Sequence, residues 1–356
     1  MTIVAHTHPF VIGVDAHART HSLSVLACPT GETVDQAQFP ATAAGLRRAI
    51  AWVARRTDGD LSTLWVIEGI GTYGALLARA AAEAGYPVAE AARMNARANR
   101  GVGKSDLLDA HRIAQAVLPL DITRLRRPRA DDGARAALRV LITSRDHIST
   151  ERTAAINALT ALLRVVDLGI DARRSLSTGQ IAVVAAWRTR DEDIATAVAR
   201  AEAIRLAKRV LSADQELAAN TKQLNEMIGS TPGRGLLELP GIGPVTAAVA
   251  VAAWSHPGRV RDEAAFASLA GVNPIPASSG NTERHRINRG GDRRLNRALH
   301  MAVVTRMRMD PRTRAYVEKR TAQGRTLREI RRCLKRYLAR EIYRHLTAAT
   351  RTPQTA

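Results

Sequence analysis

The chain has 356 residues, a formal net charge of +20 and an isoelectric point near 11.3. This length suggests two or three domains, and a hydrophobic content of 46% supports packed cores built from Ala, Leu, Val and Ile, because aromatic residues make up only 3%. Cys28 and Cys333 lie too far apart to form a metal-ligand motif or a disulfide framework. No apolar run reaches the length of a membrane span, and residues 1–10 lack the features of a signal peptide. We therefore expect a cytoplasmic, nucleoid-associated protein that does not enter a membrane.

The positive charge is concentrated near the end of the chain. Between Ser279 and Leu346 there are twenty Lys or Arg residues and six Asp or Glu residues. A coding bias towards arginine would explain the preference for Arg over Lys, but it would not explain this clustering. A field of this sign attracts polyanions, and nucleic acid is the first candidate partner.

The first third of the chain alternates between strand and helix patterns. Asp15 lies near the end of the first strand, Glu68 at the end of the fourth, and Ser105 is placed to cap the last helix. The predicted elements in chain order are a strand over 10–17, a strand, turn and strand over 20–39, a helix over 42–56, a strand over 62–74, a helix over 74–85, a strand over 86–93 and a helix over 104–119. This order is that of an RNase H-like (RuvC-like) α/β domain, which we place at residues 8–125.

Helical patterns dominate the remaining sequence. Two long helices, over 128–166 and 191–230, are separated by a loop and predict an antiparallel arm or coiled coil spanning 126–232, although no heptad repeat is sustained. A mainly helical C-terminal domain is expected over 233–349, followed by a disordered tail over 350–356. Its predicted helical segments are 236–254, 262–271, 291–308 and 327–349.

Four carboxylates stand at positions typical of a metal site. Asp15 and Glu68 end apolar strands, and Asp106 and Asp109 share one face of a helix, where their like charges repel. A bound Mg²⁺ would convert this repulsion into coordination, and two such ions ~3.5–4 Å apart stabilise both oxygens of an in-line phosphoryl displacement. The alternative is a set of structural caps and solvated acids. The occurrence of all four in this fold order favours the metal site.

A Gly-Ile-Gly hairpin typical of helix-hairpin-helix modules opens the C-terminal domain. Gly241 and Gly243 would let the backbone approach a phosphate, and the helix that begins near Pro244 would direct its amides at that anion. The alternative is a tight turn between packed helices. The longer motif "LPGIG", followed by an Ala-rich helix, favours backbone contact with nucleic acid.

Adjacent serines precede a run of arginines. Pro274, Pro276 and Gly280 predict a loop around Ser278 and Ser279, and the absence of a G-x-S-x-G motif argues against acyl chemistry. A serine that attacks a DNA phosphate would instead need cations to hold that phosphate. The available cations are Arg284, Arg286, Arg289, Arg293 and Arg294. From the local sequence alone, the serines are more simply explained as small loop residues.

Several motifs together resemble one family. They are "GVDAHARTHSLSV", "VIEGIGTYG", "KSDLLDAHRIA", "LPGIGPVTA", "FASLAGVNPIPASSG" and "GGDRRLNRAL". The chain resembles the DEDD-plus-serine transposases of bacterial insertion sequences, family one-hundred-ten, which are relatives of the Piv invertases and are described as bridge-RNA-guided recombinases. The resemblance covers almost the whole chain.

The resemblance implies a RuvC-like domain whose tetrad is Asp15, Glu68, Asp106 and Asp109, with Mg²⁺ as cofactor and Mn²⁺ as a possible substitute. It implies that the serine of a Ser-Gly pair, here Ser279 followed by Gly280, forms a covalent link to DNA. It also implies a homodimer, joined through the helical arm, that assembles into a tetrameric synaptic complex with composite sites. A structured bridge RNA would select the donor and target DNA.

Two other functions remain open. One is a RuvC-like junction nuclease that hydrolyses DNA with metal-activated water and forms no covalent intermediate. The other is a non-catalytic nucleic-acid-binding protein with a degenerate RNase H-like domain, an interpretation that the presence of all four acids disfavours.

Overall fold

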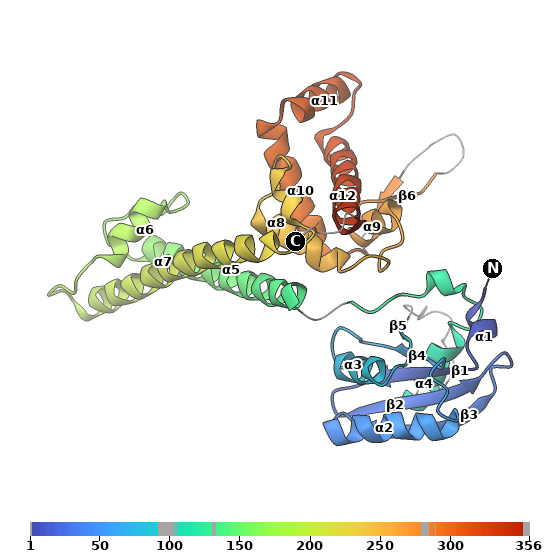
Figure 1. Ribbon diagram of the computed structural model, residues 1–356. Helices are drawn as coiled ribbons and strands as arrows, with labels where there is room; N and C mark the ends of the chain where they lie inside the picture. The colour runs from blue at the N-terminus through green and yellow to red at the C-terminus, as the bar shows by residue number, and fades with distance from the viewer. Residues whose placement is uncertain are drawn as a thin grey trace. The chain divides into compact units, whose positions relative to one another are not determined.

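A computed structural model describes residues 2–91, 103, 105–129, 133–278, 285–288 and 290–351 (Figure 1). The chain forms two compact units, Met1–Arg129 and Ala130–Ala356. The first is a mixed α/β unit with a five-stranded sheet, and the described part of the second is mainly helical. None of the helices in the described ranges combines the length and apolar content needed to cross a membrane.

The sheet of the first unit has the strand order β3-β2-β1-β4-β5. Its strands are β1 (Phe10–Ala16), β2 (Thr20–Ala27), β3 (Thr33–Pro40), β4 (Leu64–Ile67) and β5 (Val88–Glu90). The first three strands form an antiparallel meander, whereas β1–β4 and β4–β5 pair in parallel. β1 therefore lies at the centre of the sheet, and its carboxyl end lies beside that of β4.

Helices cover both faces of the sheet. α2 (Ala43–Arg56) and α3 (Ala75–Glu83) bury their apolar residues against one face, where Ile12, Val14 and Trp65 belong to the same core. On the other face, α4 (Asp106–Gln115) and the short α1 (Val4–Thr7) enclose a second core that includes Val11 and Val66. A short 3-10 helix, η1 (Ile122–Arg124), follows α4. The predicted element order is thus confirmed from β1 to α4, whereas α1 and η1 were not predicted.

Gly13 allows α4 to lie directly on β1. A Cβ atom added at Gly13 would come within 2.0 Å of the Ala110 carbonyl oxygen and 2.7 Å of the Ala114 nitrogen. No side chain larger than hydrogen fits in this space. The Ser105 hydroxyl accepts a hydrogen bond from the Leu108 amide at 3.2 Å, as predicted for the helix cap. Close packing and the cap together fix the first turn of α4 near the end of β1.

The second unit begins with two long antiparallel helices, α5 (Gly133–Val165) and α7 (Ile194–Gly229). Arg145 of α5 donates to the Leu217 carbonyl at 3.0 Å, and Arg152 pairs with Asp214, so contacts along α5 run opposite to the direction of α7. The predicted intervening loop contains a helix, α6 (Thr178–Ala185), which the sequence analysis missed. Ile181 and Val184 of α6 join an apolar core at one end of the pair.

A second core surrounds α8 (Pro244–Trp254), whose alanines are buried on nearly every side. The other elements of this region are η2 (Arg234–Glu238), α9 (Glu263–Leu269), β6 (Pro274–Pro276), β7 (His285–Ile287), α10 (Arg293–Met309), α11 (Pro311–Ala322) and α12 (Leu327–Arg351). α11 was not predicted, because its charged sequence lacks a clear apolar stripe. It begins where Asp310 accepts a hydrogen bond from the Thr313 amide at 3.0 Å.

The loop predicted at Pro274–Pro276 is wrong, because these residues form β6 and pair antiparallel with β7. Proline has no amide hydrogen to donate to a ladder, but it is tolerated in an edge strand. In this two-stranded ribbon each strand has only one neighbour, so the sequence rule against strand prolines does not apply.

Candidate active site

Strand periodicity places the acidic side chains on one face of the first unit. Val11 contributes to the core beneath α4, and side chains on one face of a strand recur every second residue, so Asp15 is on the α4 face. The same period relates Glu68 to Val66 of that core. The Glu68 amide donates to the Val14 carbonyl at 2.9 Å, which continues the parallel pairing and brings the ends of β1 and β4 together.

The structure brings Asp15 and Asp106 together through His17. The His17 Nε2 atom is 3.0 Å from Asp15 Oδ2 and 3.7 Å from Asp106 Oδ1. One potential ligand atom from each of the three residues lies within 4.8 Å of the others. Asp15 is buried, while Asp106 and His17 are about half exposed, so this cluster opens to solvent on one side.

Electrostatics connect Glu68 and Asp109 to this cluster. Burial raises the pKa of Asp15, and the charges of Asp106 and Asp109 raise it further, against the lowering effect of His17. Partial desolvation also raises the pKa of Glu68, followed by the charges of Asp15 and Asp109. Glu68 as a residue is exposed, so its carboxyl group keeps access to solvent. The four acids therefore repel one another in the absence of a cation.

Asp109 has a cationic partner within its own helix. Arg112 donates from Nη1 to Asp109 Oδ1 at 3.0 Å, and both side chains are largely buried. The arginine offsets part of the repulsion and holds the carboxylate in place. The other Asp109 oxygen has no hydrogen bond to the described residues, so it can accept a further partner.

Glutamine side chains of β3 link the sheet to α4 and to β2 near the site. Gln36 Nε2 donates to Ser24 Oγ at 3.2 Å and to the Leu107 carbonyl at 3.4 Å, and Gln38 Nε2 donates to Ser22 Oγ at 2.9 Å. Ser22 is the register partner of Asp15. The bond from Gln36 to Leu107 ties the first turn of α4 to the sheet, and the other two link β3 to β2 beside Asp15.

The sequence analysis did not predict His17 as part of the site. The available signal was its position two residues after Asp15, which puts it on the same face if the strand geometry continues. Through its hydrogen bond to Asp15, His17 orients the carboxylate that the sheet buries deepest among the four.

The donor set suits a divalent cation. Carboxylate oxygens are the ligands that Mg²⁺ prefers, and a cluster with an open side leaves room for water and substrate phosphate. The same carboxylate oxygens also suit Mn²⁺. The raised pKa values are consistent with this fit, because a cation would remove the repulsion that produces part of them.

The predicted residues of the second unit have different placements. Arg286 and Arg293 line a cavity, whereas Arg294 pairs with Asp146 of α5 at 2.6 Å. Ser278 is exposed at the end of a described stretch. The remaining predicted residues, Ser279, Arg284 and Arg289, lie outside the described residues.

The glycine hairpin is explained in part by helix packing. Gly241 has a φ of +73°, and an added Cβ would lie 2.7 Å from the Ala302 carbonyl oxygen of α10. Gly243 precedes α8, and an added Cβ there would meet nothing within 4 Å. The first glycine is thus required by packing, and the phosphate contact predicted for both stays a prediction.

Two family models match separate parts of the chain. A model of IS110-type DEDD transposases, described as a transposase, matches residues 12–166, the range that contains the four acids. A second model, described as the transposase IS116/IS110/IS902 family, matches residues 233–318. The chain is a transposase with a DEDD domain.

The relatives extend this match along nearly the whole chain. An "Insertion element IS900 uncharacterized 42 kDa protein" of Mycobacterium paratuberculosis is 30% identical over 369 residues, which cover 89% of this chain and 90% of that protein. An "Insertion element IS116 uncharacterized 44.8 kDa protein" of Streptomyces clavuligerus is 26% identical, with 88% of each chain covered. The chain belongs to the IS110/IS116/IS902 family of transposases.

Proposed function

We propose that this transposase cuts and rejoins DNA at a divalent-metal site formed by the DEDD acids, with Ser279 as the nucleophile. The proposal rests on the proximity of Asp15 and Asp106, whose ligand atoms lie with that of His17 within 4.8 Å of one another. The charge of Asp109 raises the pKa values of both Asp15 and Glu68, so the four acids influence one another. The strand order, with an antiparallel meander followed by parallel strands, supports an RNase H-like (RuvC-like) fold for this unit.

Asp15, Glu68, Asp106 and Asp109 would hold Mg²⁺, or Mn²⁺ in its place. When bound, the cation stabilises negative charge that develops on phosphate oxygens during displacement. His17 orients Asp15, and Arg112 holds Asp109, so two of the four carboxylates are positioned before any cation binds. This positioning lowers the cost of arranging the site during the reaction.

Ser279 would attack the DNA phosphate through its Oγ atom. A bond forms between Oγ and phosphorus as the serine hydroxyl loses its proton, the bond from phosphorus to one bridging deoxyribose oxygen breaks, and the leaving oxygen takes up a proton. Reversal of the step with a different DNA hydroxyl rejoins the strands and releases the serine. The Ser-Gly motif and membership of the family support this assignment.

The remaining elements of the proposal follow the same resemblance. A bridge RNA would select donor and target DNA, and a homodimer joined through the arm would assemble into a tetramer. The proposed domains are the RuvC-like domain over 8–125, the arm over 126–232, the serine domain over 233–349 and a tail over 350–356. The antiparallel pairing of α5 and α7 supports the arm.

Replacement of Asp106 tests the metal site. Asp106→Asn should reduce strand cleavage in Mg²⁺ by at least about 100-fold, because the amide removes one anionic ligand from the cluster. Cleavage of labelled element ends, with any required RNA present, measures the effect. The matched control is Glu83→Gln, which neutralises an exposed acid of the same unit at the end of α3. Full activity of Asp106→Asn would refute the metal site.

A further inference from the structure

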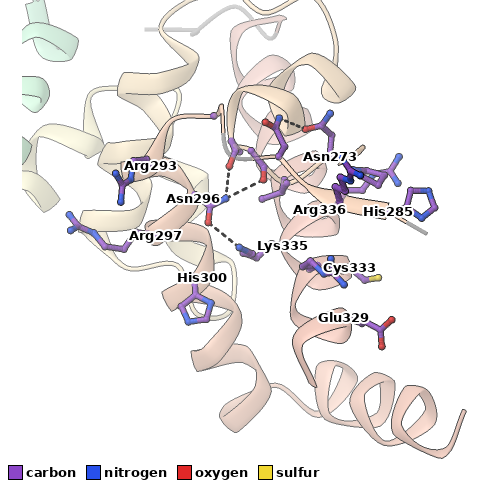
Figure 2. Close-up of a pocket in the computed structure, with 18 of the residues that line it drawn as sticks. Asn273, His285, Arg293, Asn296, Arg297, His300, Glu329, Cys333, Lys335 and Arg336 are labelled. Atoms are coloured by element: carbon purple, nitrogen blue, oxygen red, sulfur yellow. Dashed lines mark hydrogen bonds between the residues drawn. The ribbon is translucent and has the colours of Figure 1, made fainter. Parts of the chain in front are cut away.

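A large cavity lies in the second unit between α10, α12 and the β6–β7 hairpin (Figure 2). Its volume is about 1220 Å³. Arg293, Asn296 and His300 reach it from α10, while Cys333 and Lys335 reach it from α12. The cavity is therefore lined by three separate parts of the chain, the β6–β7 ribbon, α10 and α12.

The lining is strongly cationic. It contains seven arginines and one lysine, with Glu329 as its single carboxylate among the described residues. Two of the arginines have ion-pair partners, since Arg297 pairs with Asp146 and Arg325 with Glu329. Within the described ranges no ion pair is made by Arg293, Arg332 or Arg336. Unpaired guanidinium groups this close together repel one another. Their arrangement around one cavity indicates an anionic occupant.

A chain of hydrogen bonds holds Lys335 in place in this lining. Its Nζ atom donates to Asn296 Oδ1 at 3.0 Å, and Asn296 Nδ2 donates in turn to the Ala270 carbonyl at 2.7 Å. Burial, followed by the charge of Arg332, lowers the pKa of Lys335. Burial and the charges of Lys335 and Arg331 also lower the pKa of His300. The ammonium group is thus held in a positive field and keeps two donor hydrogens for an anion.

The composition of the lining indicates which anion it suits. Phosphate oxygens accept hydrogen bonds from guanidinium, ammonium and amide groups, and all three are present, since Asn273 also lines the cavity. No Phe, Tyr or Trp lines the cavity among the described residues, so bases have no aromatic surface on which to stack. These features favour the sugar–phosphate backbone over base recognition.

The hairpin relates the cavity to the proposed chemistry. His285 and Arg286 of β7 line the cavity, and Pro276 pairs with His285 in the ribbon. The residues that join the two strands include Ser279 in the sequence. Ser279 follows Pro276 by three positions, so the segment that carries the proposed nucleophile leaves β6 where Pro276 pairs with the cavity residue His285.

We propose that the α10–α12 cavity binds the backbone of the DNA strand being cut, with Lys335, held by Asn296, contacting a phosphate. Arginines of both helices contact the adjacent phosphates. Asn296 is a positioning residue, because it fixes the lysine without meeting the DNA. This inference rests on the proposed function and assigns a substrate-binding surface in which only Arg286 and Arg293 were predicted from the sequence.

Binding of labelled oligonucleotides to the full chain tests the proposal. In EDTA, where no cleavage occurs, Lys335→Gln should bind DNA about tenfold more weakly at ~0.1 M salt, since a charge-assisted hydrogen bond to phosphate is lost. The slope of log affinity against log salt should fall in magnitude by about one. Asn296→Ala should also weaken binding severalfold, but it should leave the slope unchanged because the lysine charge remains.

Lys222→Ala is the matched control, since it removes an exposed lysine of α7 and should change affinity less than twofold. Thermal melting monitored by circular dichroism verifies the fold of each variant. An unchanged affinity and slope in Lys335→Gln would overturn the proposal, as would an equal loss in Lys222→Ala. A loss confined to an RNA oligonucleotide of the same sequence would overturn the assignment to DNA.

The outcome is separable from that of the proposed function. A wild-type protein that forms a covalent DNA adduct while Lys335→Gln binds normally would refute only the cavity assignment. Weaker binding by Lys335→Gln without any adduct in the wild type would support the cavity as a DNA-binding surface and refute the serine chemistry.

Discussion

The carboxylate of Asp15 is held in a position that raises its free energy. It is buried on the central strand, and its hydrogen bond to His17 only partly offsets burial and the charges of Asp106 and Asp109. Glu68 experiences the same kind of repulsion. Both carboxyl groups have folded-state pKa values above the ordinary values of 3.8 and 4.5. Their protonated forms therefore stabilise the fold below the ordinary pKa values, and this stability is lost as the pH rises through the folded-state pKa values.

Asp15→Asn should therefore stabilise the protein in EDTA at pH 7. The amide retains a hydrogen-bonding group for His17 but removes the repelled charge, so we expect the melting temperature to rise by about 2–4 °C. The gain should shrink as pH is lowered towards 4, where the wild-type carboxylates become protonated. Added Mg²⁺ should raise the melting temperature of the wild type more than that of the variant.

Differential scanning calorimetry provides this measurement, with Glu83→Gln as the control for simple loss of an acid. Two results would contradict the proposal that Asp15 is a metal ligand destabilised by burial and charge. One is a variant less stable than the wild type in EDTA, and the other is a variant that Mg²⁺ stabilises as much as it stabilises the wild type.

The contact of α4 with β1 determines whether the carboxylates meet. Gly13 lies two residues before Asp15 on the same face, and Ala110 lies one residue after Asp109 in α4. The absence of a side chain at Gly13 lets the backbones approach until the first turn of the helix reaches the end of the strand. Gly13 therefore determines both how closely α4 packs on β1 and how closely the carboxylates approach one another.

Gly13→Ala should destabilise the first unit by about 1–3 kcal/mol, because the added Cβ overlaps the Ala110 carbonyl and α4 must move. Divalent-cation binding, measured by isothermal titration calorimetry, should weaken together with stability. Gly71→Ala is the matched control, because its Cβ would meet nothing within 4 Å. Undiminished cation affinity in Gly13→Ala would show that the site does not depend on this helix position.

Much of this architecture follows from local patterns. The apolar strands, the Ser105 cap and the long helices were predictable because each has a clear period or end signal. α6 and α11 were missed, since a short helix and a highly charged one carry little periodic signal, and the β6–β7 ribbon was hidden by its prolines. Asp15 and Glu68 could be paired from strand order alone. His17 could be suspected only from its position two residues after Asp15, and Lys335 could not be predicted, because its role depends on a contact with Asn296 of another helix.

The whole molecule combines two kinds of charge. The first unit gathers carboxylates at one edge of a sheet, and the second gathers arginines and Lys335 around a cavity. A cation site and a polyanion site are complementary requirements of phosphoryl transfer on DNA. The proposed function therefore accounts for a cluster of mutually repelling acids in a strongly basic chain.

Capture of a protein–DNA adduct tests the central proposal most directly. Wild-type protein is incubated with labelled element ends, Mg²⁺ and the flanking RNA, and the products are separated on a denaturing gel. We predict a labelled adduct in the wild type and in Ser278→Ala, and none in Ser279→Ala, although that variant still binds RNA. Cleavage without any adduct would indicate hydrolysis by a RuvC-like nuclease, and an adduct that persists in Ser279→Ala would contradict its role as the nucleophile.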